Sequence, residues 1–157
     1  MTVDSVSFRK ALGSFASGVT VVTALDDTGQ PVGLTVSAFC SVSLDPPMIL
    51  ICLDKRVSNR ETFRRGPFAV NVLSHRQQAV SNRFAEKRDD RFAGIAHTPG
   101  RNGAPVLDGC LAVIECTPEH IADGGDHDII VATVTRVDRT EDGAPLIYYR
   151  GGYAALG

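Results

Sequence analysis

The hydrophobic positions change their period several times along the chain. Near its start, Phe8, Leu12 and Phe15 recur at helical spacing, which predicts a short helix over residues 5–15 with one apolar face. Farther along, apolar and β-branched residues alternate or run together in short stretches bounded by turn-forming residues, a pattern typical of strands. The predicted strands are 19–25, 32–39, 48–53, 68–73, 110–116, 129–137, 146–149 and 153–156, with residues 40–44 continuing extended.

Two polar segments between the strands predict further helices. Ser58 and Glu61 have the spacing of a capping box that opens a short helix. Val80 and Phe84 are four residues apart, which places both on one face of a polar helix over residues 74–87.

Strands outnumber helices, and tight turns join them. The stretch DDTGQP at 26–31 favours a hairpin between the first two strands, whereas residues 88–109 are expected to be irregular. Few helices intervene between strands, and no G-x-G-x-x-G follows the first strand, so a parallel dinucleotide-binding sheet is not expected. The continuous apolar run 48–53 predicts a strand buried on both faces. We therefore predict a mainly β fold, an antiparallel barrel with flanking helices, forming a single domain over residues 1–157.

Composition removes several classes of function. The 157 residues carry a net charge of −2, and basic residues do not alternate with aromatic ones, so nucleic-acid binding is not expected. No apolar run approaches the roughly 18 residues of a membrane span, and the N-terminus lacks an apolar signal core, so we expect a cytoplasmic protein. The four cysteines form no C-x-x-C pair and are predicted to be reduced, small apolar core residues.

One segment carries an unusual number of hydroxyl groups. If residues 35–43 stay extended, side chains alternate between two faces, and one face carries four hydroxyls and an aromatic ring. Such a face suits a flat heteroaromatic ligand with many acceptor atoms, and it equally suits an ordinary solvated strand. The hydroxyl face comprises Thr35, Ser37, Phe39, Ser41 and Ser43, and the opposite, core-facing side comprises Val36, Ala38, Cys40, Val42 and Leu44.

Several stretches together resemble one known family. They are GVTVVT (18–23), GLTVSAFCSVSLDPPMILICLDKRVSN (33–59), FAVNVL (68–73), RFA (83–85), GGDHDII (124–130) and PLIYYRGGY (145–153). In this order they resemble the flavin reductases, the small reductase components of two-component flavin-dependent monooxygenases. The resemblance implies an antiparallel FMN-binding split β-barrel of Greek-key type, FMN or FAD as the flavin, NADH or NADPH as co-substrate, and a homodimer.

The resemblance also implies a set of cofactor-binding residues. Two segments would line the isoalloxazine ring, a third would meet the flavin phosphate at a helix N-terminus, where free N–H groups favour an anion, and a fourth would lie near the flavin tail. Glu61 in a capping box would place a carboxylate near that same helix end. The implied residues are Thr35, Val36, Ser37 and Ala38, then Cys52, Leu53 and Asp54, then Ser58 and Asn59, and finally Arg83 and Phe84.

The signature Gly125-Asp126-His127 is implied to meet the nicotinamide, with His127 positioning it. Either Asp126 or Asp128 is placed to orient the imidazole, and the sequence leaves the choice open. No third ligand accompanies His120 and His127, so no metal site is expected. The chain departs from the family at Asp54, where Asn is common, and at Ala132, near a common Gly, and both departures bear on flavin affinity and redox tuning.

The implied reaction is hydride transfer from nicotinamide C4 to flavin N5, with reduced flavin then diffusing to a partner oxygenase. This chemistry needs no nucleophile, and no G-x-S-x-G motif is present. Two alternatives remain: a non-catalytic flavin-binding or carrier module, and a barrel for another ligand such as deazaflavin or haem, with His97 or His120 as candidate haem ligands.

Overall fold

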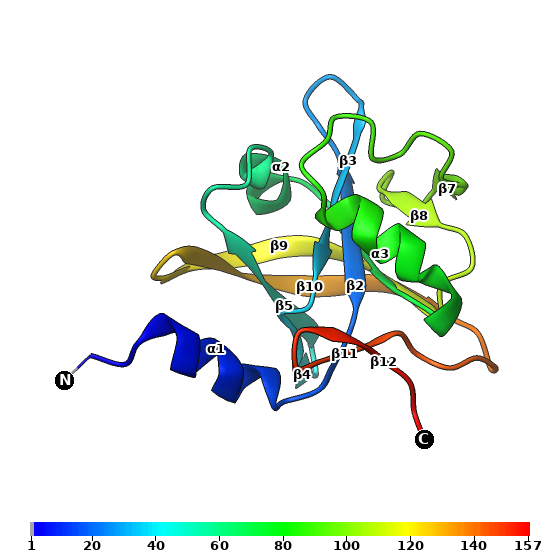
Figure 1. The fold of residues 1–157 in the computed structure, drawn as a ribbon. Helices are drawn as coiled ribbons and strands as arrows, with labels where there is room; N and C mark the ends of the chain where they lie inside the picture. The colour runs from blue at the N-terminus through cyan, green and yellow to red at the C-terminus, as the bar shows by residue number, and fades with distance from the viewer. Residues whose placement is uncertain (1) are drawn as a thin grey trace.

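The structure is a computed structural model that describes residues 2–157, and Met1 lies outside the described residues. Every strand pairing in the described part is antiparallel, and the principal sheet has the order β3-β2-β6-β9-β10-β5-β4 (Figure 1). The mainly β, antiparallel class predicted from the sequence is therefore confirmed. The elements are α1 (Ser5–Gly13), β1 (Ser17–Gly18), β2 (Thr20–Leu25), β3 (Pro31–Val36), β4 (Phe39–Leu44), β5 (Pro47–Asp54), α2 (Arg60–Arg65), β6 (Phe68–Val72), the 3-10 turn η1 (His75–Gln77), α3 (Gln78–Ala85), β7 (His97–Pro99), β8 (Pro105–Leu107), β9 (Ala112–Gly124), β10 (His127–Arg139), β11 (Ile147–Tyr149) and β12 (Gly152–Ala154).

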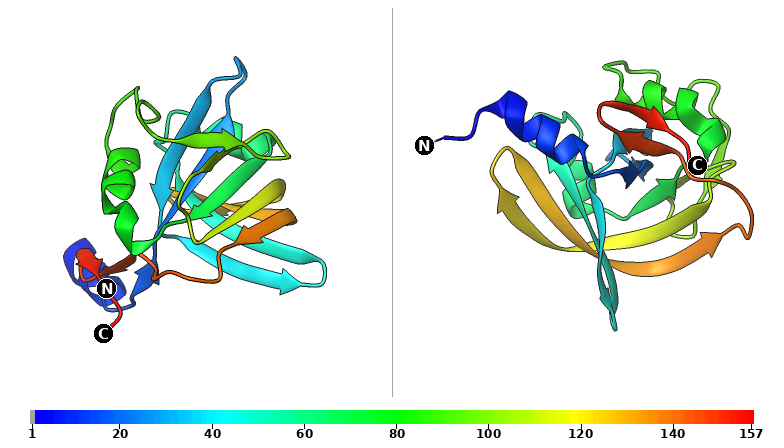
Figure 2. Two further views of the ribbon diagram at one scale, coloured as in Figure 1. Left: turned by 90° about the vertical axis from the view of Figure 1, so that its right-hand side faces the viewer. Right: turned by 60° about the horizontal axis from the view of Figure 1, so that its bottom comes forward.

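The sheet curls until its two end strands meet. β3 and β4 occupy opposite ends of the strand order, yet only Ser37 and Ala38 separate them in the chain. The Phe39 amide donates to the Ser37 carbonyl at 2.9 Å, and the Cys52 amide of β5 donates to the Ala38 carbonyl at 3.0 Å. The result is a barrel-like curl (Figure 2). We call residues 37–38, which join the two end strands, the seam.

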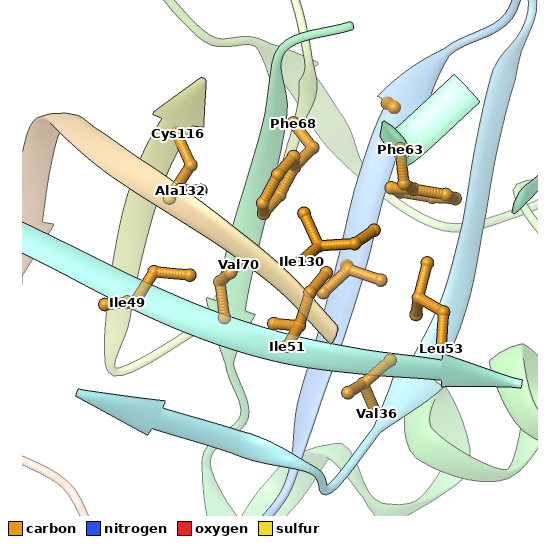
Figure 3. Packing of buried hydrophobic residues seen from close by; sticks show 12 residues of the cluster. Val36, Ile49, Ile51, Leu53, Phe63, Phe68, Val70, Cys116, Ile130 and Ala132 are labelled. Carbon is orange, nitrogen blue, oxygen red and sulfur yellow. The ribbon is translucent and has the colours of Figure 1, made fainter. Parts of the chain in front are cut away.

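The interior of this curl is filled by apolar side chains from opposite walls. Ile51 and Leu53 of β5 point toward Phe68 of β6 and Ile130 of β10, and Phe63 of α2 closes one end (Figure 3). These side chains are at most 1% exposed, and full burial of each such side chain stabilises a fold by about 1.5–3 kcal/mol.

The predicted strand 32–39 is two segments rather than one. β3 ends at Val36, and the turn at the seam interrupts the alternation of faces that was predicted across residues 35–43. Val36 is buried as predicted, but Ala38, Cys40, Val42 and Leu44 are exposed, so the prediction of a core face there is wrong. The reason is that β4 is an end strand bonded only to β5, with a bulge between Ser41 and Ser43.

β5 is buried on one face only, contrary to the sequence prediction. Ile49, Ile51 and Leu53 are buried, while the alternate positions Leu50 and Cys52 are half-buried. An antiparallel sheet commonly packs one face on the core and leaves the other accessible, which explains the difference.

The first helix forms, but its apolar face is uncovered. The Asp4 carboxylate caps it by accepting the Ser7 amide at 2.9 Å. Phe8 and Leu12 are 54% and 57% exposed, and Phe15, beyond the end of α1, is 82% exposed. The helix extends away from the body of the sheet (Figure 2).

The capping box predicted at Ser58 and Glu61 is wrong. α2 begins at Arg60 with Asn59 at its cap, and no side chain caps it, because Glu61 pairs instead with arginines of the same helix. A capping box does form at Ser74 and Gln77, where η1 precedes α3. The helix predicted over 74–87 therefore starts as a 3-10 turn and ends at Ala85.

Two regions contain more strand than predicted. The irregular segment 88–109 holds the β7–β8 hairpin. β9 and β10 form one long hairpin that continues past the predicted limits of 116 and 129 to meet at a glycine turn.

The cysteines are all free, as predicted. Cys110 and Cys116 are buried, and burial raises their pKa to about 11 and about 12 respectively, so both remain protonated near neutral pH. The prediction that all four are core residues is wrong for Cys40, which is exposed on the end strand, and Cys52 is half-buried.

Candidate functional site

A cavity of about 830 Å³ opens between β3, the turn after β5, and the segment that follows α3. Its lining includes predicted site residues from four separate stretches of sequence. These are Thr35, Asp54, Ser58, Asn59 and Phe84. The volume lies within the range typical of cofactor sites, roughly 300–1,000 Å³.

One wall of the cavity depends on a glycine in β3. A Cβ atom on Gly33 would lie 2.9 Å from Phe84 Cε1 and 3.1 Å from the Val22 carbonyl oxygen. The missing side chain therefore lets α3 lie directly against β3. Thr35 Oγ1 strengthens this contact by donating to the Ser81 carbonyl at 2.6 Å.

The turn after β5 is built around Asp54. Its carboxylate accepts the Arg56 amide at 2.8 Å and pairs with the Arg56 guanidinium at 2.6 Å. The Val57 amide donates to the Asp54 carbonyl at 3.0 Å. The hydrogen bonds and charge of Arg56 hold the pKa of the Asp54 carboxyl well below its ordinary range, so it is an anion that shapes the turn.

This turn presents Ser58 and Asn59 to the cavity. Ser58 is exposed and Asn59 is half-buried, with its Oδ1 atom buried and without a hydrogen-bond partner among the described residues. An unpaired buried acceptor needs an N–H or O–H donor from a ligand or a water molecule. Glu61 pairs with Arg64 and Arg65 and does not cap the helix, but it remains in the first turn of α2, so a carboxylate does lie near this helix end.

The structure places Arg83 beside the cavity rather than in its lining. Its guanidinium donates to the carbonyls of Asp90, Arg91 and Ala93 at 3.1, 2.9 and 2.6 Å, and so fixes the loop after α3. The cations that line the cavity are Arg56, Lys87, Arg88 and Arg91. Sequence reasoning missed these four, although the basic cluster at 83–91 was an available signal for the last three.

The Gly-Asp-His signature lies at the turn between β9 and β10. Gly125 has a φ of 78°, in the left-handed region that glycine adopts readily. His127 begins β10 and is paired with Asp54 of β5 across the sheet. The signature is therefore adjacent to the cavity through Asp54 and is not part of its lining.

The choice between the two aspartates is settled by geometry. His127 Nδ1 lies 2.6 Å from Asp126 Oδ1, and this hydrogen bond lowers the pKa of the Asp126 carboxyl. Asp128 is buried and pairs with Arg60 at 3.2 Å and Arg64 at 3.4 Å. Asp126 is thus the residue that orients the imidazole, which leaves Nε2 available to a ligand.

The remaining predicted ring contacts lie at or behind the seam. Val36 and Leu53 point into the core, so only their backbone groups can serve a ligand. Ser37 and Ala38 are exposed at the seam, and Cys52 is bonded to it through its amide. These positions lie outside the cavity lining, although they continue from it along β3 and β5.

The candidates for other ligand chemistry lie elsewhere. His97 is exposed near Phe92, and His120 is exposed on β9. Within residues 2–157, no group of three or more His, Cys, Asp or Glu side chains is arranged to hold a metal ion. None of the described helices has the length and apolar character needed to cross a membrane.

The curled antiparallel sheet and the cavity beside it define a mainly β protein with room for a cofactor, and the His127–Asp126 pair lies on the strand next to Asp54. The model of the flavin reductase like domain matches residues 12–157, and the chain belongs to this family.

Curated relatives support this assignment. The chain is 40% identical over 98% of its length to the reductase subunit HsaB of a flavin-dependent monooxygenase from Rhodococcus jostii, covering 79% of that protein. It is 46% identical over 96% of its length to a probable flavin reductase of Rhizobium meliloti, of which it covers 48%. The chain thus spans about half the length of that relative.

Solved structures agree with the fold. A putative oxidoreductase from Sinorhizobium meliloti superposes with a TM-score of 0.94 at 45% identity, covering 98% of this chain and 54% of that one. The NADH:FAD oxidoreductase SgcE6 of Streptomyces globisporus, in complex with NAD and FAD fragments, superposes with a TM-score of 0.93 at 32% identity, covering 100% and 97%.

Proposed function

We propose that the protein is an NAD(P)H:flavin oxidoreductase that reduces FMN or FAD and supplies the reduced flavin to a partner monooxygenase. The proposal rests on the observation that one cavity brings together Thr35, Asp54, Ser58 and Asn59. His127 lies next to this cavity, because it is paired with Asp54 on the neighbouring strand β10. We further propose that residues 1–157 form one flavin reductase-like domain, Met1 being outside the described residues.

A bound flavin would supply the acceptor for hydride from the nicotinamide. The chain's own residues bind and orient. The β3 backbone from Thr35 to Ala38 and the strand end at Cys52–Asp54 would line the ring, and Ser58 with Asn59 would receive the phosphate. His127, whose Nδ1–H donates to Asp126, would use Nε2 to accept a hydrogen bond from the carboxamide N–H of the nicotinamide.

The partners follow from the relatives and from the surface. Relatives include reductase subunits of flavin-dependent monooxygenases, which supports an oxygenase partner reached by diffusion of reduced flavin. The exposed apolar face of α1 supports a homodimer. We place the protein in the cytoplasm, where thiols such as its free cysteines stay reduced.

The test is NADH or NADPH oxidation followed at 340 nm with FMN or FAD present. Purified protein is expected to accelerate it with at least one pair of cofactors. His127→Ala is expected to raise the KM for the nicotinamide about tenfold, with the flavin Kd changed less than about twofold, since it removes a contact to one substrate only.

His120→Ala is the matched control, because His120 is an exposed histidine of the adjacent strand and lies outside the site. Flavin binding without nicotinamide oxidation would instead identify a flavin-binding or carrier module. Equilibrium dialysis against FMN, FAD, a deazaflavin and haemin ranks the remaining ligands, and absence of flavin binding would refute the proposal.

A further inference from the structure

The turn that follows β5 and the turn that joins β9 to β10 are fastened together by one residue, Lys55. Its backbone amide donates to the Asp126 carbonyl at 2.9 Å, and its ammonium group donates to the Gly125 carbonyl at 2.6 Å. The same ammonium group pairs with the Asp123 carboxylate. Three contacts therefore reach residues on both sides of the glycine turn that precedes His127.

A second fastening lies on the far side of His127. Arg60, the first residue of α2, pairs with the buried Asp128 carboxylate at 3.2 Å. Both fastenings start from the segment that contains Ser58. His127 is consequently bracketed by contacts to the same segment that lines the cavity.

The ion pair between Lys55 and Asp123 contributes little to the stability of the fold. The Lys55 side chain is 34% exposed and that of Asp123 is 77% exposed, and an ion pair so open to solvent adds little to the folding free energy. Its geometric effect is larger, because Gly124 and Gly125 give the turn more backbone freedom than any other residue pair would. The Gly125 carbonyl that receives the ammonium group lies in the middle of this turn.

We propose that Lys55 is a positioning residue, which holds the Gly124–Gly125 turn against the Asp54–Asn59 segment and thereby sets the distance of His127 from the flavin cavity. This inference rests on the proposed function, since it gives His127 a nicotinamide to meet. Lys55 touches neither cofactor in this scheme. It acts through the turn: if the turn shifts, His127 shifts with it, and the nicotinamide is no longer aligned with the flavin.

The experiment compares Lys55→Met, Lys55→Arg and Asp123→Asn in steady-state kinetics. Lys55→Met is expected to raise the KM for NADH about fivefold, with the flavin Kd changed less than about twofold and kcat at saturating NADH nearly unchanged. Lys55→Arg is expected to keep the KM for NADH close to the wild-type value, because arginine also supplies a cationic donor. Asp123→Asn has a smaller effect, since the bond to the Gly125 carbonyl remains.

Arg139→Met is the matched control. Arg139 is an exposed cation paired with the exposed Glu141 at the opposite end of β10, and its loss is expected to leave every parameter unchanged. An unchanged NADH KM in Lys55→Met, or a flavin Kd that rises as much as the KM, would overturn the inference.

Hydrogen exchange separates this inference from the proposed function. Amides of residues 124–127 are expected to exchange faster in Lys55→Met than in wild type, in the absence of any nicotinamide. If wild-type protein oxidises no nicotinamide, the proposed function fails. Faster exchange at residues 124–127 in Lys55→Met would still show that Lys55 holds the turn in place. If wild type is active and exchange at the turn is unaltered, the role of Lys55 fails alone.

Discussion

At the scale of single residues, the site depends on a missing side chain more than on any reactive one. Gly33 is buried in β3 between the Val22 carbonyl and the Phe84 ring. The first of these neighbours is backbone and cannot move aside without breaking strand pairing. The cavity wall therefore tolerates no Cβ at this position.

Gly33→Ala is expected to destabilise the fold by about 1–3 kcal/mol, the usual cost of forcing an extra carbon into a packed interior. It is also expected to weaken flavin binding, because Gly33 lines the cavity. Urea unfolding and a flavin titration measure the two effects. Gly18→Ala serves as control, since a Cβ there meets nothing within 4 Å. Equal unfolding midpoints for the two variants would contradict the argument.

At the scale of elements, local patterns predicted strands well and their ends poorly. β2 and β6 were predicted nearly to their boundaries because apolar and β-branched residues fill them. The break at Ser37–Ala38 was missed because both residues suit a strand, and the break comes from closure of the sheet rather than from turn chemistry. The start of α2 was misplaced because Glu61 had closer cationic partners than the helix cap.

α2 itself illustrates how a short helix is held by its surroundings. Six residues are too few for independent stability, so the helix relies on Phe63 in the core and on the pairing of Arg60 and Arg64 with Asp128. Asp128→Asn removes the buried anion that Arg60 and Arg64 share and leaves them only the more exposed Glu61. Their side chains are 26% and 30% exposed, so a loss of about 1–3 kcal/mol is expected, below the cost for a fully buried pair.

Urea unfolding measures this loss, and hydrogen exchange at α2 locates it. Asp138→Asn is the matched control, because Asp138 is an exposed aspartate of the same strand. Unchanged stability in Asp128→Asn would mean that Phe63 alone holds the helix.

At the scale of the whole molecule, the sequence indicated the fold class, and some of the residues predicted for the site line the cavity, but the sequence did not show how they meet. The order of the sheet and the cavity arise from contacts between distant segments, which local periodicity does not encode. The four cations that line the cavity, among them Arg56 and Lys87, were missed because charged loops look alike in sequence until a fold brings them together. The same limit applies to Phe8 and Leu12, whose helical spacing indicated a buried face that no element of the described chain covers.

That uncovered face is the basis of the last prediction, which concerns assembly. Phe8 and Leu12 are four residues apart on α1, and a second copy of the chain is the partner expected to bury them. Removing two apolar anchors worth about 1.5–3 kcal/mol each should raise a dimer Kd about a hundredfold or more. Light scattering coupled to size exclusion is therefore expected to show a dimer for wild type and a monomer for the Phe8→Ser, Leu12→Ser double variant.

Val137→Ser, which removes a 67% exposed side chain at the far end of β10, should remain dimeric. A monomeric wild-type protein at micromolar concentration would assign the face of α1 to a different partner, and a dimer that survives both serine substitutions would place the interface elsewhere.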